Sequence, residues 1–287
     1  MKMTESHIFK YVTIGIIAFW LIVFVFFPNI LVFIVSFLTR DEANLIALDL
    51  TFDNYLKLLD PIYLQVLIDS VIMAFVTTVL CLIAAFPFSY ILSRVQSASR
   101  KNILLMLIII PFWTSALIRT YAIKIILTTN GLINTFLLKL DIIDTPLDML
   151  YTQGAVITGL VYTLLPFMIL PLYATLEKFD TRVIEAASDL GANKFHTFVR
   201  IVIPLSAPGI VAGSLLVFLP ALGLFYIPDI LGGSKTLLIG NLVKNQFMDS
   251  RNWPFGSAVS MMLTIIMALL LLANYRSIKS MSKKGVL

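Results

Sequence analysis

Charged residues are scarce in this 287-residue sequence, in which Lys, Arg, Asp and Glu together make up 13%. A soluble domain of ordinary composition carries about a quarter charged residues. Hydrophobic residues account for 59% of the chain, and the mean hydropathy is +0.96. The shortage of charge excludes an ordinary soluble domain and indicates a protein that is embedded in a lipid bilayer.

The sequence also lacks the residues from which several kinds of site are built. Cys81 is the only cysteine, so the chain cannot form an intrachain disulfide. His7 and His196 are the only histidines, too few and too far apart for a His-based metal site. No glycine is followed by lysine, which excludes the phosphate-binding loop G-x-x-x-x-G-K-[ST]. No Ser/His/Asp grouping is suggested, and we expect no catalytic residue, metal or cofactor in this chain.

Long stretches without charge are what the sequence has instead. Asp, Glu, Lys and Arg are missing from residues 11–39, 70–93, 102–118, 149–176, 201–228 and 252–275. Each run is near or above the roughly 17–25 residues that span a bilayer, and the shortest can extend past Arg119 if that side chain snorkels. We predict an all-α membrane protein, folded as one domain over 1–287, with six transmembrane helices at about 9–39, 64–94, 102–125, 152–176, 204–230 and 254–276.

Basic residues are unevenly distributed over the segments between these runs. The two termini and the loops after the second and fourth runs hold 13 of the 21 basic residues but only 5 of the 16 acidic ones. Loops rich in Lys and Arg stay in the cytoplasm, so both termini and the loop at about 177–204 are predicted to be cytoplasmic. The net charge of +5 is explained by this topology, and no basic cluster resembles a nucleic-acid binding surface.

The fifth run is interrupted by proline and glycine more often than the others. Proline removes backbone hydrogen bonds, and unsatisfied backbone groups are not tolerated against lipid. One interpretation is close packing through small residues, and the other is a helix that lines a cavity, which the whole set favours. The set is Pro204, Pro208, Gly209, Gly213, Pro220, Gly223, Pro228 and Gly232-Gly233.

Residues 125–138 are uncharged over too few positions to span a bilayer. They predict a short interfacial or re-entrant helix on the outer face. The pair Asn130-Gly131 is a turn signal and should interrupt that helix.

Residues 185–204 place a charged segment, EAASDLGANKFHTFVRIVIP, within this hydrophobic sequence. A first short helix would end at Gly191, where a left-handed conformation is favoured. Asn193 can cap a second helix, whose apolar positions from Phe195 to Val202 follow i, i+3, i+4, i+7 spacing. We predict a helical hairpin that either lies on the membrane surface or presents its surface to a protein partner.

The same segment resembles the EAA signature of ABC importer permeases. That signature places Glu-Ala-Ala, three residues, Gly, nine residues, Ile, one residue and Leu-Pro in this order. This chain has Glu185-Ala186-Ala187, Gly191, Ile201 and Ile203-Pro204, with isoleucine in place of the usual leucine. In that family the loop is a coupling helix that seats in a groove of the ATP-hydrolysing subunit. The resemblance implies a type I importer permease whose coupling residues are Glu185, Ala186, Ala187, Asp189, Gly191 and Phe195.

The resemblance also implies partners and a location. A second, similar permease subunit is expected, with a homodimer of ATPase subunits that bind ATP and magnesium, and a binding protein in the periplasm. The chain itself would be a transport subunit of a bacterial inner membrane, surrounded by lipid, and not an enzyme.

Four further segments, 111–125, 159–180, 219–233 and 238–247, resemble the permeases of spermidine/putrescine importers, which implies a polyamine cargo. Two alternatives remain open. One is a permease for another small solute. The other is a self-sufficient secondary transporter driven by the membrane potential, which favours cation entry by about 2.3 kcal/mol per charge per 100 mV.

A polyamine is a flexible chain of ammonium groups, and carboxylates, carbonyls and aromatic rings can replace its hydration. Asp229 follows Phe225 and Tyr226 at the outer end of the fifth run. We predict a cargo gate there, with a solvated helix-end aspartate as the alternative. Asp69 stands where the second run begins, and is interpreted as an N-terminal cap or dipole partner.

Three other residues are candidates for the cargo path. Lys244 could pair with Asp229 when the path is empty, or it could face solvent. Trp113 and Tyr121 could line the path, or they could serve in packing or as anchors at the membrane interface.

Overall fold

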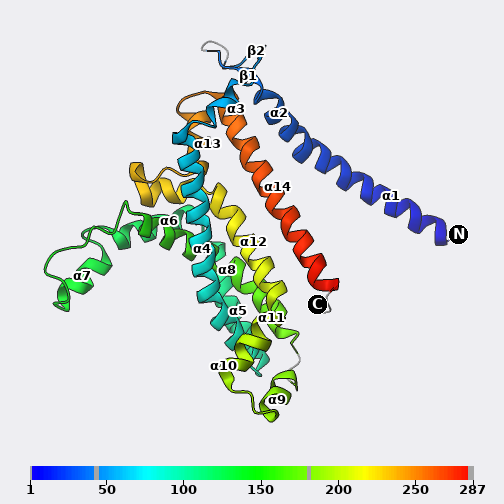
Figure 1. The fold of residues 1–287 in the computed structure, drawn as a ribbon, viewed down its shortest axis with the longest axis vertical. Helices are drawn as coiled ribbons and strands as arrows, with labels where there is room; N and C mark the ends of the chain where they lie inside the picture. Colours follow the sequence, from blue (N-terminus) through cyan, green and yellow to red (C-terminus); the bar gives the residue numbers. More distant parts are fainter. Residues whose placement is uncertain (1, 42–44, 180–181, 284–287) are drawn as a thin grey trace. The chain divides into compact units, whose positions relative to one another are not determined.

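The computed structural model describes residues 2–41, 45–179 and 182–283. Asp180 and Lys284, which enter the charge comparison above, lie outside the described residues. In chain order the elements are α1 (Lys2–Leu21), η1 (Ile22–Phe26), α2 (Phe27–Val35), β1 (Leu38–Thr39), β2 (Ala47–Leu50), α3 (Asp53–Lys57), α4 (Pro61–Ser93), α5 (Ala98–Ile109), η2 (Ile110–Trp113), α6 (Ala116–Leu127), α7 (Leu132–Lys139), α8 (Gln153–Glu177), α9 (Arg182–Asp189), α10 (Lys194–Thr197), η3 (Phe198–Val202), α11 (Ile203–Leu205), α12 (Ala207–Gly223), η4 (Pro228–Gly232), η5 (Gly233–Lys235), α13 (Ile239–Met248) and α14 (Trp253–Lys283) (Figure 1).

Most of the described chain is helical, and its long helices are apolar. Five segments are long and apolar enough to cross a bilayer, and a pair of helical segments that meet at 64° gives a sixth if the pair is one span. Counting that pair as one span agrees with the six transmembrane helices expected from the sequence. The five are Lys10–Val35, Pro61–Ser93, Ala116–Lys139, Gln153–Glu177 and Trp253–Asn274, and the pair is Lys194–Leu205 with Ala207–Gly223.

The chain contacts form two compact units. The first contains the residues up to Leu64 together with Leu242–Ile266, and the second contains Gln65–Asn241 together with the residues from Met267 onward.

In the first unit, the segment after α2 forms two short strands and a short helix. β1 and β2 form a two-stranded antiparallel sheet, so the described chain is not wholly α-helical. The side-chain amide of Asn54 donates to the carbonyl oxygens of Ser36 (3.1 Å) and Leu38 (2.8 Å), and so ties α3 to this sheet. Asp53 and Asn54 begin the short helix α3.

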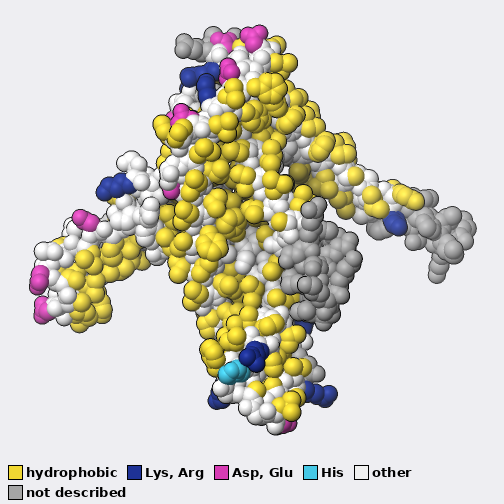
Figure 2. Space-filling view, in the orientation of Figure 1, with side chains coloured by type: hydrophobic (Ala, Val, Ile, Leu, Met, Phe, Trp, Pro, Cys, Tyr) yellow, Lys and Arg dark blue, Asp and Glu magenta, His cyan; other side chains and the backbone are white. Residues whose placement is uncertain are grey.

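In the second unit, α4, α8 and α12 pack side by side (Figure 1). A Cβ atom added to Gly213 would lie 2.6 Å from Sδ of Met168, and one added to Gly209 would lie 2.9 Å from Cβ of Thr175. These glycines of α12 thus permit close contact with α8, which agrees with the interpretation that the small residues of this segment serve close helix packing. Figure 2 shows hydrophobic side chains over most of the visible surface of α4 and α12.

The third predicted span, 102–125, is not a continuous helix. α5 ends at Ile109, a 3₁₀ turn containing Pro111 follows, and Thr114 and Ser115 are extended before α6 begins. Proline has no amide hydrogen and restricts the residue before it, which explains the break. The predicted interruption at Asn130-Gly131 is present, because it lies between α6 and α7.

The fifth predicted span, 204–230, is also shorter than expected. The chain bends by 64° between Leu205 and Ala207, and α12 ends at Gly223, where Leu224 turns extended with φ −68° and ψ 120°. Pro220, inside the last turn of α12, lacks the amide hydrogen needed there. Residues 225–230 therefore lie beyond the helix.

Asp69 is not at the beginning of a helix. α4 starts at Pro61, and the Asp60 carboxylate accepts a hydrogen bond from the Ile62 amide at 3.0 Å. At 3.6 residues per turn, Asp69 lies more than two turns inside α4. The interpretation of Asp69 as an N-terminal cap or dipole partner is therefore wrong.

Candidate functional site

Two groups of residues lie at separate places in the second unit, and each contains residues that the sequence predicted. The Asp229 cluster consists of Phe225, Tyr226, Asp229 and Asn241, just beyond α12. The hairpin is the segment Arg182–Leu205, formed by α9, α10, η3 and α11.

The Asp229 cluster is held together by the side-chain amide of Asn241. Its nitrogen donates hydrogen bonds to a carboxylate oxygen of Asp229 and, at 2.9 Å, to the carbonyl oxygen of Phe225. Asn241 is 2% exposed, whereas Asp229 is half-buried. Asn241 therefore fixes the orientation of a carboxylate that is only partly shielded from solvent. Sequence reasoning missed Asn241, although a single amide in the apolar start of α13 was a signal.

The aromatic side chains complete this cluster. The rings of Phe225 and Tyr226 lie 6.2 Å apart at 88°, an edge-to-face arrangement. Phe225 is 44% exposed and Tyr226 is half-buried. The cluster thus offers a carboxylate, a phenol and aromatic carbon, the groups that can take the place of water around an organic ammonium ion.

Two glycines allow the segments of this cluster to approach their neighbours. A Cβ atom on Gly240 would lie 2.7 Å from the carbonyl oxygen of Gly223, so α13 begins directly against the end of α12. A Cβ atom on Gly159 would lie 2.9 Å from the Ile227 side chain, so α8 supports the turn that carries Asp229. Larger residues at either position would displace backbone or buried side chains.

Arg119 belongs to α6, which packs against η4, the element that carries Asp229. Its guanidinium carbon lies 5.2 Å from the ring centroid of Phe112. Its Nε is buried, and has no hydrogen-bond partner among the residues that the structure describes. The sequence suggested snorkelling for this side chain, but the structure holds it half-buried against an aromatic ring.

The other predicted path residues have different surroundings. Lys244 lies 3.9 Å from the Asp249 carboxylate, and its pairing with Asp229 stays a prediction. Trp113 is 81% exposed at the end of η2. Tyr121 is 53% exposed, with the Lys124 ammonium 6.0 Å from its ring centroid.

In the hairpin, the joint has the geometry that the sequence predicted. Gly191 has φ +82°, in the left-handed region that disfavours side chains with a Cβ. The Leu190 amide donates to the Ala186 carbonyl at 3.1 Å, and the Ala192 amide donates to the Ala187 carbonyl at 3.0 Å. These bonds close the end of α9 in the way of a glycine C-cap.

The second half of the hairpin is capped and anchored. The Asn193 side-chain oxygen accepts a hydrogen bond from the His196 amide at 2.8 Å, which confirms the predicted cap. The ring of Phe198 lies edge-to-face against Phe86 at 5.4 Å and against Tyr90 at 6.2 Å. The hairpin is thereby seated on the C-terminal part of α4.

Much of the hairpin faces outward. Ala187 is buried, but Glu185, Ala186 and Asp189 are exposed, and Phe195 is 73% exposed. Leu190, which follows the last residue of α9, is 88% exposed. Basic side chains gather around α9 and α10 in Figure 2. Beside these exposed residues lies a cavity of about 550 Å³, lined by Tyr90, Ile184, Lys194, Phe195, Thr197, Phe198 and Val202.

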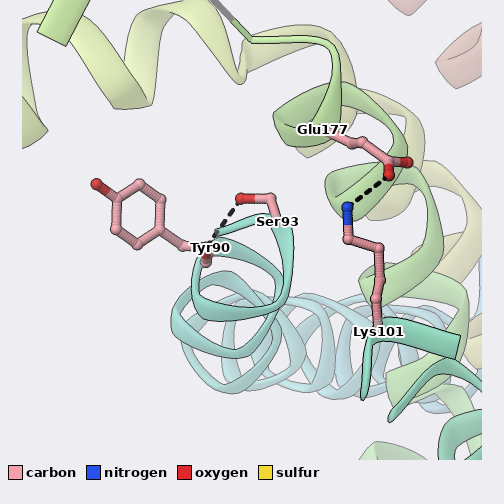
Figure 3. A network of polar contacts seen from close by, with 4 residues as sticks. All are labelled: Tyr90, Ser93, Lys101 and Glu177. Carbon is pink, nitrogen blue, oxygen red and sulfur yellow. Dashed lines mark hydrogen bonds and ion pairs between the residues drawn. The ribbon is translucent and has the colours of Figure 1, made fainter. Parts of the chain in front are cut away.

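An ion pair joins two helices near the base of the hairpin. The Lys101 ammonium of α5 lies 3.0 Å from the Glu177 carboxylate at the end of α8, and Ser93 at the end of α4 bonds the Tyr90 carbonyl at 2.8 Å (Figure 3). The ion pair thus fixes the start of α5 against the end of α8.

Comparison with known proteins identifies the family. Residues 13–282 match the family described as "binding-protein-dependent transport system inner membrane component". The chain belongs to that family. It is therefore an inner-membrane subunit of an ABC transport system, and its hairpin carries the family's EAA signature.

Relatives in this family are similar over nearly the whole chain. The chain is 52% identical to the spermidine/putrescine transport system permease protein PotB of Salmonella typhimurium (strain SL1344), over 99% of this chain and 98% of that one. It is 52% identical to PotB of Escherichia coli (strain K12), over 92% and 96%, and 51% identical to PotB of Haemophilus influenzae (strain ATCC 51907 / DSM 11121 / KW20 / Rd), over 99% of both.

A solved structure supports the permease fold. A chain of a bacterial alginate ABC transporter, in complex with its alginate pentasaccharide-bound periplasmic protein, superposes with a TM-score of 0.78 over 99% of this chain and 97% of that one. The sequence identity is 14%, so this likeness shows the fold alone.

Proposed function

We propose that this chain is the permease subunit of an ATP-driven importer that carries polyamines such as spermidine and putrescine across the bacterial inner membrane. The observation that carries the proposal is the identity of 51–52% to PotB proteins over nearly the whole chain. The fold does not specify the cargo, since a transporter of alginate, an acidic polysaccharide, has it too. The choice of cargo must therefore lie in side chains.

The chemistry of the Asp229 cluster supports a cationic cargo. Asp229 supplies negative charge, while the rings of Phe225 and Tyr226 can attract an ammonium group through their π faces. Because Asn241 already holds one carboxylate oxygen of Asp229, little side-chain motion is needed when the cargo arrives. We propose that this cluster is the outer cargo gate. Lys244 would pair with Asp229 when the path is empty and would release it when the cargo arrives.

The hairpin is proposed to couple the permease to its motor. Its exposed residues Glu185, Ala186, Asp189 and Phe195 would contact a groove of the ATPase, and Gly191 would fix the angle between its two arms. Phe198, packed on α4, would pass the movement to the membrane helices. This arrangement requires the hairpin and both termini to lie in the cytoplasm.

The finer assignment of partners belongs to the same proposal. The importer would contain a second, PotC-like permease subunit and a PotA-like ATPase homodimer that binds ATP and magnesium. A PotD-like periplasmic protein would deliver the polyamine. The chain lacks a phosphate-binding loop, so ATP hydrolysis would take place in the partner subunits.

The test is transport by the assembled complex. The permease is expressed with its partner subunits, reconstituted into proteoliposomes and supplied with ATP on the ATPase side and loaded binding protein on the other. We expect uptake of radiolabelled spermidine that stops without ATP. Spermidine uptake by the purified chain alone, driven by membrane potential, would instead establish a secondary transporter. Uptake of another solute without competition from spermidine would contradict the polyamine assignment.

A further inference from the structure

The ammonium group of Lys124 lies over two tyrosine rings that come from separate segments of the chain. It is 6.0 Å from the ring centroid of Tyr121, one turn earlier in α6, and 5.8 Å from that of Tyr151, just before α8. Both distances fall within the range in which a cation is attracted to the face of an aromatic ring. Among the described residues, no carboxylate forms an ion pair with Lys124. The two rings therefore stand where a counter-ion would otherwise be needed.

The position of Lys124 in the chain makes this arrangement informative. The residue is half-buried and lies within Ala116–Lys139, a segment apolar enough to cross a bilayer. An ionisable side chain in such a segment is costly and generally serves a function. Tyr121 is 53% exposed and Tyr151 is 41% exposed, so both rings keep surface that a ligand can reach.

The Tyr151 ring is held in place by its own backbone and by Gly233. Tyr151 has φ +60°, in the left-handed region that residues with a Cβ rarely adopt, and its amide donates to the Leu231 carbonyl at 2.9 Å. A Cβ atom added to Gly233 would lie 2.8 Å from Cδ1 of Tyr151, so the ring packs directly against the backbone there. Strained backbone of this kind is found where the surroundings fix it, often at ligand-binding sites.

The two rings border the turn that carries Asp229. Leu231, which holds the Tyr151 amide, belongs to η4, as Asp229 does. The helix α6, which carries Tyr121, also packs against η4. The aromatic pair and the Asp229 cluster are therefore built on one short element.

We propose that Tyr121 and Tyr151 form a second binding site for an ammonium group of the cargo, and that Lys124 occupies this site while the path is empty. A lysine side chain ends in a primary alkylammonium, which is also the terminal group of a polyamine. Rings that hold one can therefore hold the other. When the cargo arrives, Lys124 would swing aside on its flexible four-carbon stem.

This inference rests on the proposed polyamine function and adds a recognition point to the Asp229 cluster. A cargo with two ammonium groups could engage the carboxylate of Asp229 with one and the two rings with the other. Such a pair of contacts would favour a polyamine over a singly charged amine.

The alternative is that Lys124 only ties α6 to the segment before α8. A structural tie is broken by removing either partner, so loss of the lysine and loss of a ring should both lower transport. A built-in competitor gives opposite signs. Loss of a ring should lower transport, whereas loss of the lysine should raise it, because the cargo then meets no rival for the rings and less repulsion.

The experiment measures ATP-dependent uptake of radiolabelled spermidine by the reconstituted complex, with loaded binding protein below saturation and assembly checked by co-purification of the ATPase. Tyr121→Leu and Tyr151→Leu should each lower uptake about threefold or more, while Tyr151→Phe, which keeps the ring, should stay near wild type. Lys124→Gln should raise uptake about twofold or more. Lys139→Gln, at an exposed lysine that ends α7, is the matched control and should change nothing.

The outcomes separate the inference from the function on which it rests. Failure of the wild-type complex to import spermidine would contradict the proposed function. Wild-type import with undiminished uptake in the two leucine variants would overturn the ring site alone, and Tyr121→Leu decides if Tyr151→Leu does not assemble. Unchanged or lower uptake in Lys124→Gln would show that the lysine is not a competitor. An equal rise in Lys139→Gln would show a general effect of charge, and would overturn the inference as well.

Discussion

The hairpin takes its geometry from caps and turns within Arg182–Leu205, whereas the Asp229 cluster depends on how the start of α13 packs against the turn after α12. In the hairpin, Gly191 makes the joint and Asn193 caps the next helix, each within a few residues of its partners. In the cluster, Asp229 is oriented by Asn241, which arrives on another helix. A cap or a glycine joint can be recognised as a motif, but a contact that depends on how two elements pack has no such signature.

The two regions should also fail differently when they are altered. A defect in the hairpin should uncouple ATP hydrolysis from transport. Spermidine uptake should then change, and so should the stimulation of ATP hydrolysis by loaded binding protein. A defect in the Asp229 cluster should lower uptake, with coupling to the ATPase intact. Each variant below is therefore measured for spermidine uptake and for the ATPase activity stimulated by loaded binding protein.

The largest effect is expected from Asp229→Asn. The substitution keeps the shape of the side chain but removes the negative charge proposed to compensate the cargo. A charge-assisted contact is worth about 1.5–3 kcal/mol, so uptake should fall roughly tenfold or more. Radiolabelled spermidine uptake measures this, after co-purification has shown that the complex assembles. Unchanged uptake would return Asp229 to the interpretation of a solvated residue.

Gly191→Val should have the next largest effect. A side chain with a Cβ costs about 1–2 kcal/mol in the left-handed conformation, so the joint should distort and uptake should fall by about five- to tenfold. Gly15→Val is the matched control, because at both glycines an added Cβ would meet no described atom within 4 Å, and of the two only Gly191 has a positive φ. Wild-type uptake in Gly191→Val would show that the angle of the hairpin does not matter for coupling.

A smaller effect is expected from Phe195→Ala. The ring is 73% exposed, so its removal should leave the stability of the isolated permease nearly unchanged. If the ring seats in the ATPase, the variant should retain less ATPase on co-purification and show weaker stimulation of hydrolysis. Val12→Ala, an exposed apolar residue of α1, serves for comparison. Full retention of the ATPase by Phe195→Ala would place the contact elsewhere on the hairpin.

The smallest effect is expected at Tyr226. Tyr226→Ala removes the ring and should lower uptake by a few-fold, since an ammonium–ring contact is worth about 0.5–2 kcal/mol. Tyr226→Phe keeps the ring and should be milder. The same uptake assay compares the two variants. Equal losses in both would indicate that the hydroxyl, and not the ring face, contacts the cargo.

Several wrong expectations have a common origin in the use of charge-free runs to locate helices. The run that begins after Asp69 suggested a helix starting there, but Asp60-Pro61 starts α4 earlier and leaves Asp69 within the helix. The run 102–118 suggested a continuous span, yet Pro111 ends α5 and a new helix follows. Charge marks what a bilayer disfavours, while proline and caps mark where helices begin and end.

The sequence by itself determined the membrane class, the family, the joint of the hairpin and its cap. These depend on composition and on contacts between residues close in the chain, so a linear pattern contains them. Only the tertiary structure placed Asn241 on Asp229 and Arg119 against Phe112. Each of those contacts joins two consecutive or nearby elements across a break in the helix, and the break sets which side chains meet.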